Sequence, residues 1–179
     1  MAAVLNKWLV KERSDPERIT LCQNAAFTLK LVAKRLSCRT DSTSLIETMS
    51  KCTDLISEYR TLDECMVGNV LLLAGELIRS HNMRITMMSA IPLLKNCLSI
   101  LSECCSDQKK LGDLSDQAED ATAKRRRVRQ QSLSGRKLGS STLLICALTC
   151  TQRILDQFAP FVSQFIPEVL VQFCRLYGR

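Results

Sequence analysis

Apolar residues recur every three or four positions along most of the chain, and short polar stretches divide them into runs of helical length. The predicted helices span residues 17–36, 42–59, 62–79, 83–104, 139–157 and 161–177. The run at 62–79 is apolar on nearly every side, which is typical of a helix covered by neighbours. Gly and Pro are scarce, at six and four residues, which argues against an all-β fold. The pattern predicts an all-α protein.

The first two helices each have a clear inward stripe. In the first, the stripe consists of Ile19, Cys22, Ala26, Leu29, Val32 and Leu36. In the second, it consists of Leu45, Met49, Cys52 and Ile56. Asp15 or Ser14 is expected to cap the first helix, because Pro16 suits its first position. Residues 3–12 predict only a short amphipathic piece.

The last forty residues predict a hairpin of two helices joined at Ala159-Pro160. Placing Ile91-Pro92 on Ile166-Pro167, an offset of 75, aligns the apolar stripes of residues 83–104 and 161–177. Any two amphipathic helices align to some extent, but here the prolines coincide and are expected to kink both helices. We therefore favour a repeat, and with it an α-solenoid of HEAT-like antiparallel hairpins. The absence of a polar capping helix after residue 177 suggests a piece of a longer array.

Between the two repeats lies a stretch of different character. Residues 106–138 are polar and highly charged, contain no aromatic residue and show no sustained apolar period. Such composition predicts a disordered connector. The predicted organisation is therefore HEAT-like hairpins over 1–105, a disordered basic and acidic connector over 106–138, and a HEAT-like hairpin over 139–179.

The net charge of +7 suggests an acidic partner, but the charge is uneven. Residues 107–137 hold nine Lys or Arg against five Asp or Glu, so they carry +4 of the total. With aromatic residues at 4%, neither a broad nucleic-acid surface nor stacking platforms are indicated. No apolar run approaches the length of about 18 residues that a membrane span needs. The ten cysteines lie mostly in apolar helical runs without a secretory signal, so buried free thiols inside the cell are expected.

A search for chemistry finds no catalytic constellation. His81 is the sole histidine and falls in a predicted turn, and Glu76 is best explained as a structural carboxylate. Neither CxxC-type zinc turns nor glycine-rich phosphate loops are present. We predict a non-enzymatic protein with no cofactor, metal site or small-molecule substrate.

One cluster does suggest a binding role. Its basic residues, with an upstream pair, are Lys109, Lys110, Lys124, Arg125, Arg126, Arg127 and Arg129. This arrangement resembles a bipartite nuclear-localisation signal, so an import receptor is an expected partner, with phosphate contacts as a second use. The alternative is a solvated basic loop without an address function. Ser132 and Ser134 follow the cluster as phosphorylation candidates, because added phosphate would reduce the positive charge.

Three stretches carry a family resemblance: KWLVKERSDPERITLCQNAAFTLKLVAKRLS, NVLLLAGELIRSHNMRITMMSAIPLLKNCLSIL and SSTLLICALTCTQRILDQFAPFVSQFIPEVLVQFCRL. The last two share an apolar helix, a polar turn, an "IP" element and a closing apolar helix. Together the three stretches resemble successive units of the large HEAT-repeat subunit of the small-subunit processome, which is associated with small nucleolar ribonucleoproteins. The chain would then be a fragment of a much longer protein.

The resemblance implies a scaffold in the nucleus and nucleolus that acts in pre-ribosomal RNA transcription and processing. Its implied partners are other processome subunits and pre-rRNA or snoRNA, contacted directly or through those subunits. No binding residue is carried over, because the matching positions are core positions. The alternative is a HEAT-type adaptor in nuclear transport or kinase signalling.

Overall fold

The computed structural model describes residues 2–35, 42–80, 83–112 and 141–177, and these form helices joined by short turns. The α-helices are α1 (Ala2–Leu5), α2 (Pro16–Arg35), α3 (Ser42–Ser57), α4 (Glu64–Ser80), α5 (Met83–Gly112), α7 (Ser141–Val162) and α8 (Ile166–Tyr177). Three 3₁₀ turns accompany them in the described ranges: η1 (Asn6–Trp8), η2 (Tyr59–Thr61) and η3 (Ser163–Phe165). The predicted all-α class is confirmed.

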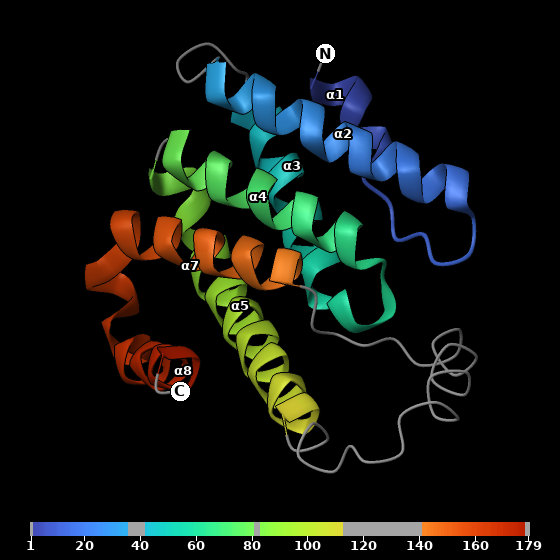
Figure 1. The fold of residues 1–179 in the computed structure, drawn as a ribbon. Helices are drawn as coiled ribbons and strands as arrows, with labels where there is room; N and C mark the ends of the chain where they lie inside the picture. The colour runs from blue at the N-terminus through green and yellow to red at the C-terminus, as the bar shows by residue number, and fades with distance from the viewer. Residues whose placement is uncertain (1, 36–41, 81–82, 113–140, 178–179) are drawn as a thin grey trace, which may run out of the picture.

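The longer helices form two layers. In one layer α4 lies between α2 and α7, and in the other α5 lies between α3 and α8 (Figure 1). The layers join through the packing of α3 on α4 and of α5 on α7. Within each layer, a helix thus packs on its second neighbour among the described helices, as expected when successive helix pairs stack. The fold is a HEAT-like helical array.

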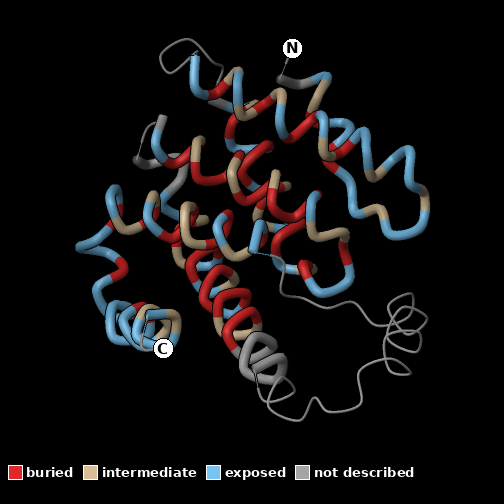
Figure 2. The backbone as a smooth tube through the Cα atoms, in the orientation of Figure 1, coloured by how far each residue is buried: buried red, intermediate tan, exposed pale blue. Residues whose placement is uncertain are grey.

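Helix α4 forms the centre of this arrangement. Its apolar side chains are almost all buried, and Figure 2 shows burial concentrated on α4 and α5 while α8 is largely exposed. Two glycines bring α4 close to α7. A Cβ atom at Gly68 would lie 3.3 Å from the Sγ of Cys146, and one at Gly75 would lie 3.5 Å from the Cα of Cys150. The absence of side chains at these positions allows the two helices to approach.

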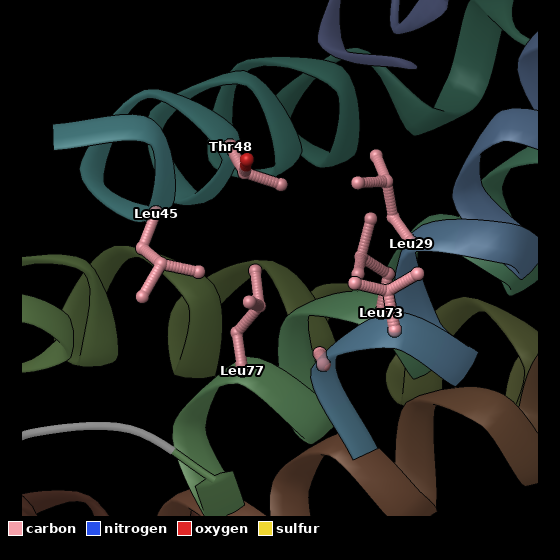
Figure 3. Close-up of a pocket in the computed structure, with 7 residues that line it drawn as sticks. Leu29, Leu45, Thr48, Leu73 and Leu77 are labelled. Carbon is pink, nitrogen blue, oxygen red and sulfur yellow. The ribbon is translucent and has the colours of Figure 1, made fainter. Parts of the chain in front are cut away.

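The predicted inward stripes are largely confirmed. All four stripe residues of α3 are buried, and so are Cys22, Ala26 and Leu29 of α2. Where α2, α3 and α4 meet, mostly apolar side chains leave a space of about 10 Å³, close to the least that a single water molecule needs (Figure 3). Its lining is apolar apart from Thr48, whose hydroxyl lies within hydrogen-bonding distance of the Asn6 side-chain oxygen and the Ser44 carbonyl. The core is therefore closely packed in this region.

Side chains cap the first turns of two helices. The carboxylate of Asp15 accepts hydrogen bonds from the backbone N–H of Glu17 at 3.0 Å and of Arg18 at 3.4 Å. Of the two predicted candidates, Asp15 is therefore the cap of α2. Asp63 caps α4 in the same way through the N–H of Met66, at 2.9 Å. Caps satisfy amide groups that have no partner inside the helix, and so they fix where each helix begins.

The amino-terminal residues run along α3. Asn6 is fully buried and donates to the carbonyl of Ser44 at 3.3 Å, while its own side-chain oxygen accepts from Thr48 at 2.7 Å. Lys51 donates to the backbone carbonyl of Asn6 at 2.7 Å. Further along, Lys11 and Arg13 both pair with Glu58, beyond the end of α3. We call residues 2–13 the amino-terminal strap. It covers α3 from its first turn to its last.

Two helix ends differ from the predictions. Helix α5 continues to Gly112 instead of ending near residue 104, so residues 106–112, assigned to the connector, have helical backbone. The remainder of the connector, residues 113–138, lies outside the described ranges. Pro92 sits well inside α5, and the polar residues after Cys105 continue a helix that no proline or glycine interrupts before Gly112.

The closing hairpin also differs. Helix α7 runs past Pro160 to Val162, with a non-helical residue at Phe158, where φ is −126° and ψ is 15°. A 3₁₀ turn follows, and α8 begins only at Ile166, which places Pro167 in its first turn. The expectation that the aligned prolines lie at matching positions inside their helices was therefore wrong, because Pro92 lies inside α5 and Pro167 lies at the start of α8. Helix α7 packs chiefly on α4 and α5, and α8 packs on α5, so α7 and α8 do not form the close pair that was expected.

Candidate interaction surface

The structure leaves the predicted basic site untested. Lys109 and Lys110 belong to the last turns of α5, and their side chains are not described. The other predicted site residues lie outside the described ranges: Lys124, Arg125, Arg126, Arg127, Arg129, Ser132 and Ser134. Import signalling, phosphate contact and phosphorylation therefore remain predictions.

The described residues show no metal-binding arrangement. No group of three or more His, Cys, Asp or Glu side chains in the described ranges is placed to hold a metal ion. His81 falls outside those ranges. Glu76 forms an ion pair with Arg79 one turn along α4, which agrees with the structural role predicted for it.

The described cysteines are free thiols, and most are buried as predicted. Burial raises the pKa of Cys22, Cys52 and Cys146. A hydrogen bond with Cys97, followed by burial, raises the pKa of Cys150. Since the thiolate is the reactive form, these thiols are chemically quiet core residues. Cys65 and Cys174 are the exposed cysteines in the described part of the chain.

A groove opens between α3 and α5 on the outer face of their layer. It encloses about 450 Å³ and is lined by Ile46, Ser50, Thr53, Asp54, Met88, Ser89 and Pro92. Two of its apolar side chains stand unusually far into solvent, with Ile46 52% exposed and Met88 82% exposed. We call this feature the α3–α5 groove. It combines exposed apolar surface with several hydrogen-bonding oxygens.

The polar lining of the groove is rich in acceptors. Asp54 is exposed, and its carboxylate makes no hydrogen bond or ion pair with any other described residue. Thr53 donates its hydroxyl proton to the carbonyl of Met49, at 3.0 Å, so its oxygen is left to act as an acceptor. No Lys or Arg side chain is among the described residues that line the groove, whereas Asp54 is. The groove is therefore suited to a positively charged group that donates hydrogen bonds.

A second exposed feature is the outer face of α8. Four residues, spaced four, four and three apart, form what we call the α8 ridge: Ile166, Leu170, Cys174 and Tyr177. Leu170 is 57% exposed and Tyr177 is 77% exposed. Another face of α8 carries the buried Val169, and just before α8 the ring centroid of Phe165 in η3 lies 5.7 Å from the Nζ of Lys95 on α5. The α8 ridge is an apolar face without a covering helix among the described elements.

Carboxylates at the end of α3 tie separate elements together. Hydrogen bonds from Lys11 and Arg13 lower the pKa of Glu58. On α5, burial raises the pKa of Glu103, but hydrogen bonds from Arg60 and then Tyr59 outweigh burial and leave this pKa below its usual range. The Tyr59 hydroxyl donates to the Glu103 carboxylate at 2.6 Å. These contacts are structural, since each charge is already paired.

Neither the groove nor the ridge was identified from the sequence. A groove between α3 and α5 depends on how two helices, some forty residues apart, are placed side by side. The available signal was local: Ile46 lies next to the inward residue Leu45 and is apolar without belonging to the stripe. Met88 stands out in the same way beside Ala90, which is buried.

The chain has a close match to a known protein. It is 48% identical, over 185 aligned positions, to a protein of Caenorhabditis elegans described as "HEAT repeat-containing protein 1 homolog". The match covers 100% of this chain and 11% of that protein. The similarity supports a HEAT-repeat protein. No family model matches the chain, and no solved structure matches it.

The HEAT-repeat similarity agrees with the two-layer array of helices. Its alignment extends over the whole chain, so the groove and the ridge lie within the matched region. The chain spans 11% of the length of the curated relative that it matches. In addition, no helix in the described ranges is long and apolar enough to cross a membrane.

Proposed function

We propose that this chain is a segment of a HEAT-repeat scaffold that acts in nucleolar ribosome biogenesis, in the transcription and processing of small-subunit rRNA. Its work is to bind, and its partners are other processome subunits together with pre-rRNA or snoRNA. RNA contact is made directly or through those subunits. No reaction is assigned to it.

The observation that carries this proposal is the 48% identity along the whole chain to a HEAT repeat-containing protein. Resemblance of three stretches, at residues 7–37, 69–101 and 140–176, to the large HEAT-repeat subunit of the small-subunit processome supplies the cellular role. The physical features support binding rather than catalysis, because the exposed features are an apolar ridge and an open groove, and the described thiols are mostly buried.

Affinity capture tests the proposed function. The tagged chain, expressed in cells, should recover pre-rRNA and processome subunits from nuclear extract. A matched control is the Leu98→Asp variant, because Leu98 is 6% exposed on α5 and an isolated charge there disrupts the helix packing. Recovery by both proteins would show non-specific binding. Recovery of import receptors or kinases without rRNA would support the adaptor alternative instead.

Nuclear import is tested separately through the basic cluster. Replacing Arg125, Arg126 and Arg127 with Ala should exclude the tagged protein from the nucleus, because the import receptor loses its cationic ligand. The control replaces Lys34 and Arg35, which are exposed at the end of α2, and should leave localisation unchanged. A phosphomimetic Ser132→Asp should weaken import in the same direction as the Arg replacements. Unaltered distribution of all variants would contradict the proposed import signal.

A further inference from the structure

We propose that the α3–α5 groove binds an arginine or lysine side chain presented by an extended segment of a protein partner. The inference rests on the scaffold role proposed above and specifies the chemistry of one partner. Its basis is that one open groove combines apolar walls, oxygen acceptors and the Asp54 carboxylate, which has no cationic partner among the described side chains.

The apolar walls match the stem of a long cationic side chain. Ile46 stands on α3, and Met88 and Pro92 stand on α5, so hydrophobic surface is present on both sides of the groove. Arg and Lys bury their methylene groups against such surface while the charged end stays near polar atoms. Methionine adapts its shape readily, which suits a surface that receives a flexible side chain.

The polar atoms of the groove can satisfy the charged end. The hydroxyl oxygen of Thr53 accepts, because its proton is donated to Met49. Pro92 has no N–H, so α5 lacks the hydrogen bond that residue 92 would otherwise donate to the carbonyl of Met88. A guanidinium group carries five donors and an ammonium group three, and neither accepts. The Asp54 carboxylate and the Thr53 oxygen can therefore accept from a cationic group, and the Ser50 and Ser89 hydroxyls, which also line the groove, can accept as well as donate.

The carboxylate of Asp54 supplies charge complementarity. It is exposed at the groove and has no cationic partner among the described side chains. Lys51 is a nearby cation on α3, but it is engaged by Glu47 at 3.0 Å and by the backbone of Asn6 at 2.7 Å. A nucleic-acid strand would bring its phosphates to Asp54, and none of the described side chains that line the groove is a cation that could neutralise them. The structure thus favours a basic protein segment over RNA in this groove.

Peptide binding to the complete chain tests the proposal. The probe is a fluorescent heptapeptide with one central arginine, flanked by leucine and glycine, and the matched probe replaces arginine with neutral citrulline. Fluorescence anisotropy should show that the arginine peptide binds about fivefold more tightly than the citrulline peptide, a difference appropriate to an exposed ion pair. The advantage should shrink as salt is raised.

Variants locate the interaction. Asp54→Asn should remove the preference for arginine, whereas Asp156→Asn, an exposed carboxylate on α7 outside the groove, should preserve it. Met88→Ala should weaken both peptides alike, because it removes apolar wall without removing charge. Circular dichroism should show unchanged helicity for all three variants, which lie at exposed positions.

The proposal is overturned if the two peptides bind equally, if Asp54→Asn has no effect, or if a single-stranded RNA oligonucleotide displaces the arginine peptide from this groove. The capture experiment is independent. If nuclear capture succeeds while the peptide fails to bind, only the groove assignment is wrong. If the arginine peptide binds as described and capture of rRNA fails, the nucleolar role is wrong and the groove assignment stands.

Discussion

The Sγ atom of Cys146 on α7 lies 3.3 Å from the point where a Cβ atom would stand at Gly68 on α4. About two turns further along α4, a Cβ atom at Gly75 would lie 3.5 Å from both the Cα of Cys150 and the Cγ of Arg153. The first distance is tighter than an ordinary van der Waals contact, and the second is ordinary. Two glycines of one helix thus face the same neighbour with different amounts of room.

This difference predicts that two alanine substitutions change stability by different amounts. Gly75→Ala should raise the free energy of unfolding by about 0.5–1 kcal/mol, because alanine favours the helix and meets no clash. Gly68→Ala should leave the free energy of unfolding roughly unchanged. The cost of moving the Cys146 side chain should offset the gain from alanine's preference for the helix. Urea denaturation of the two variants measures the comparison. Equal stabilisation at both positions would contradict the close approach at Gly68.

Asn6 should stabilise the amino-terminal strap more than its neighbours do. Replacing it with Ala removes the bond to Ser44 and leaves the buried hydroxyl of Thr48 with one acceptor fewer. The expected loss is about 1–3 kcal/mol of unfolding free energy, the usual cost of breaking a buried polar contact. Lys7→Ala, at an exposed position of the same turn, is the control and should change stability little. A loss of similar size in both variants would show that the strap is held by something else.

We expect Glu103 to account for part of the loss of stability of the fold in acid. Its pKa in the folded chain lies below the ordinary value of 4.5. The stability that the ionised Glu103 carboxylate adds to the fold is therefore complete above pH 4.5 and is lost as the pH falls below that value. Glu103→Gln should lower stability at neutral pH by about 1 kcal/mol, because Arg60 and Tyr59 lose a charged acceptor.

The same variant should show a shallower decline of stability below pH 4.5 than the unmodified chain, since it has no carboxylate to protonate at this position. Thermal denaturation between neutral and acidic pH measures both effects. Glu47→Gln, which affects an exposed pair within α3, serves as the comparison and should change stability less. A steeper acid decline for Glu103→Gln would contradict the direction of the pKa.

Thiol labelling should separate the cysteines by burial. Cys65 and Cys174 are exposed and should react quickly with a thiol reagent in the folded chain. Cys22, Cys52 and Cys150 should react only on unfolding, because they are buried and their raised pKa values reduce the thiolate fraction. Mass spectrometry of peptides labelled before and after addition of urea assigns each site. Fast labelling of Cys150 in the native chain would contradict the packing of α7 on α5.

Local features were predictable from the sequence because they depend on neighbouring residues. The stripe of α3 and the cap at Asp15 follow from spacing and side-chain chemistry within one helix. The end of α5 was harder, because helical backbone persists into a polar, charged stretch without an apolar period. Pro160 misled the hinge prediction: α7 continues past it, and the departure from helical geometry occurs at Phe158, whose side chain is fully buried.

Which helices pack against each other could not be predicted from the sequence in the same way. An apolar stripe indicates that a helix is covered, but not which neighbour covers it. For this reason α7 was predicted to pair with α8, whereas in the structure it packs on α4 and α5. The α3–α5 groove arises from that arrangement, and its residues could not be grouped before it was known. The basic cluster around Arg126 lies outside the described ranges and stays a prediction.

The neighbours of α4 and α8 have a consequence for how the array opens. Helix α4 packs on α2, α3 and α7, whereas α8 packs chiefly on α5. Amide hydrogens should therefore exchange with solvent deuterium first along α8 and last along α4, because a helix held from one side detaches without disturbing the rest. Unfolding would proceed as peeling from one edge, and a partner bound along the α8 ridge would slow exchange there before it affected any other helix.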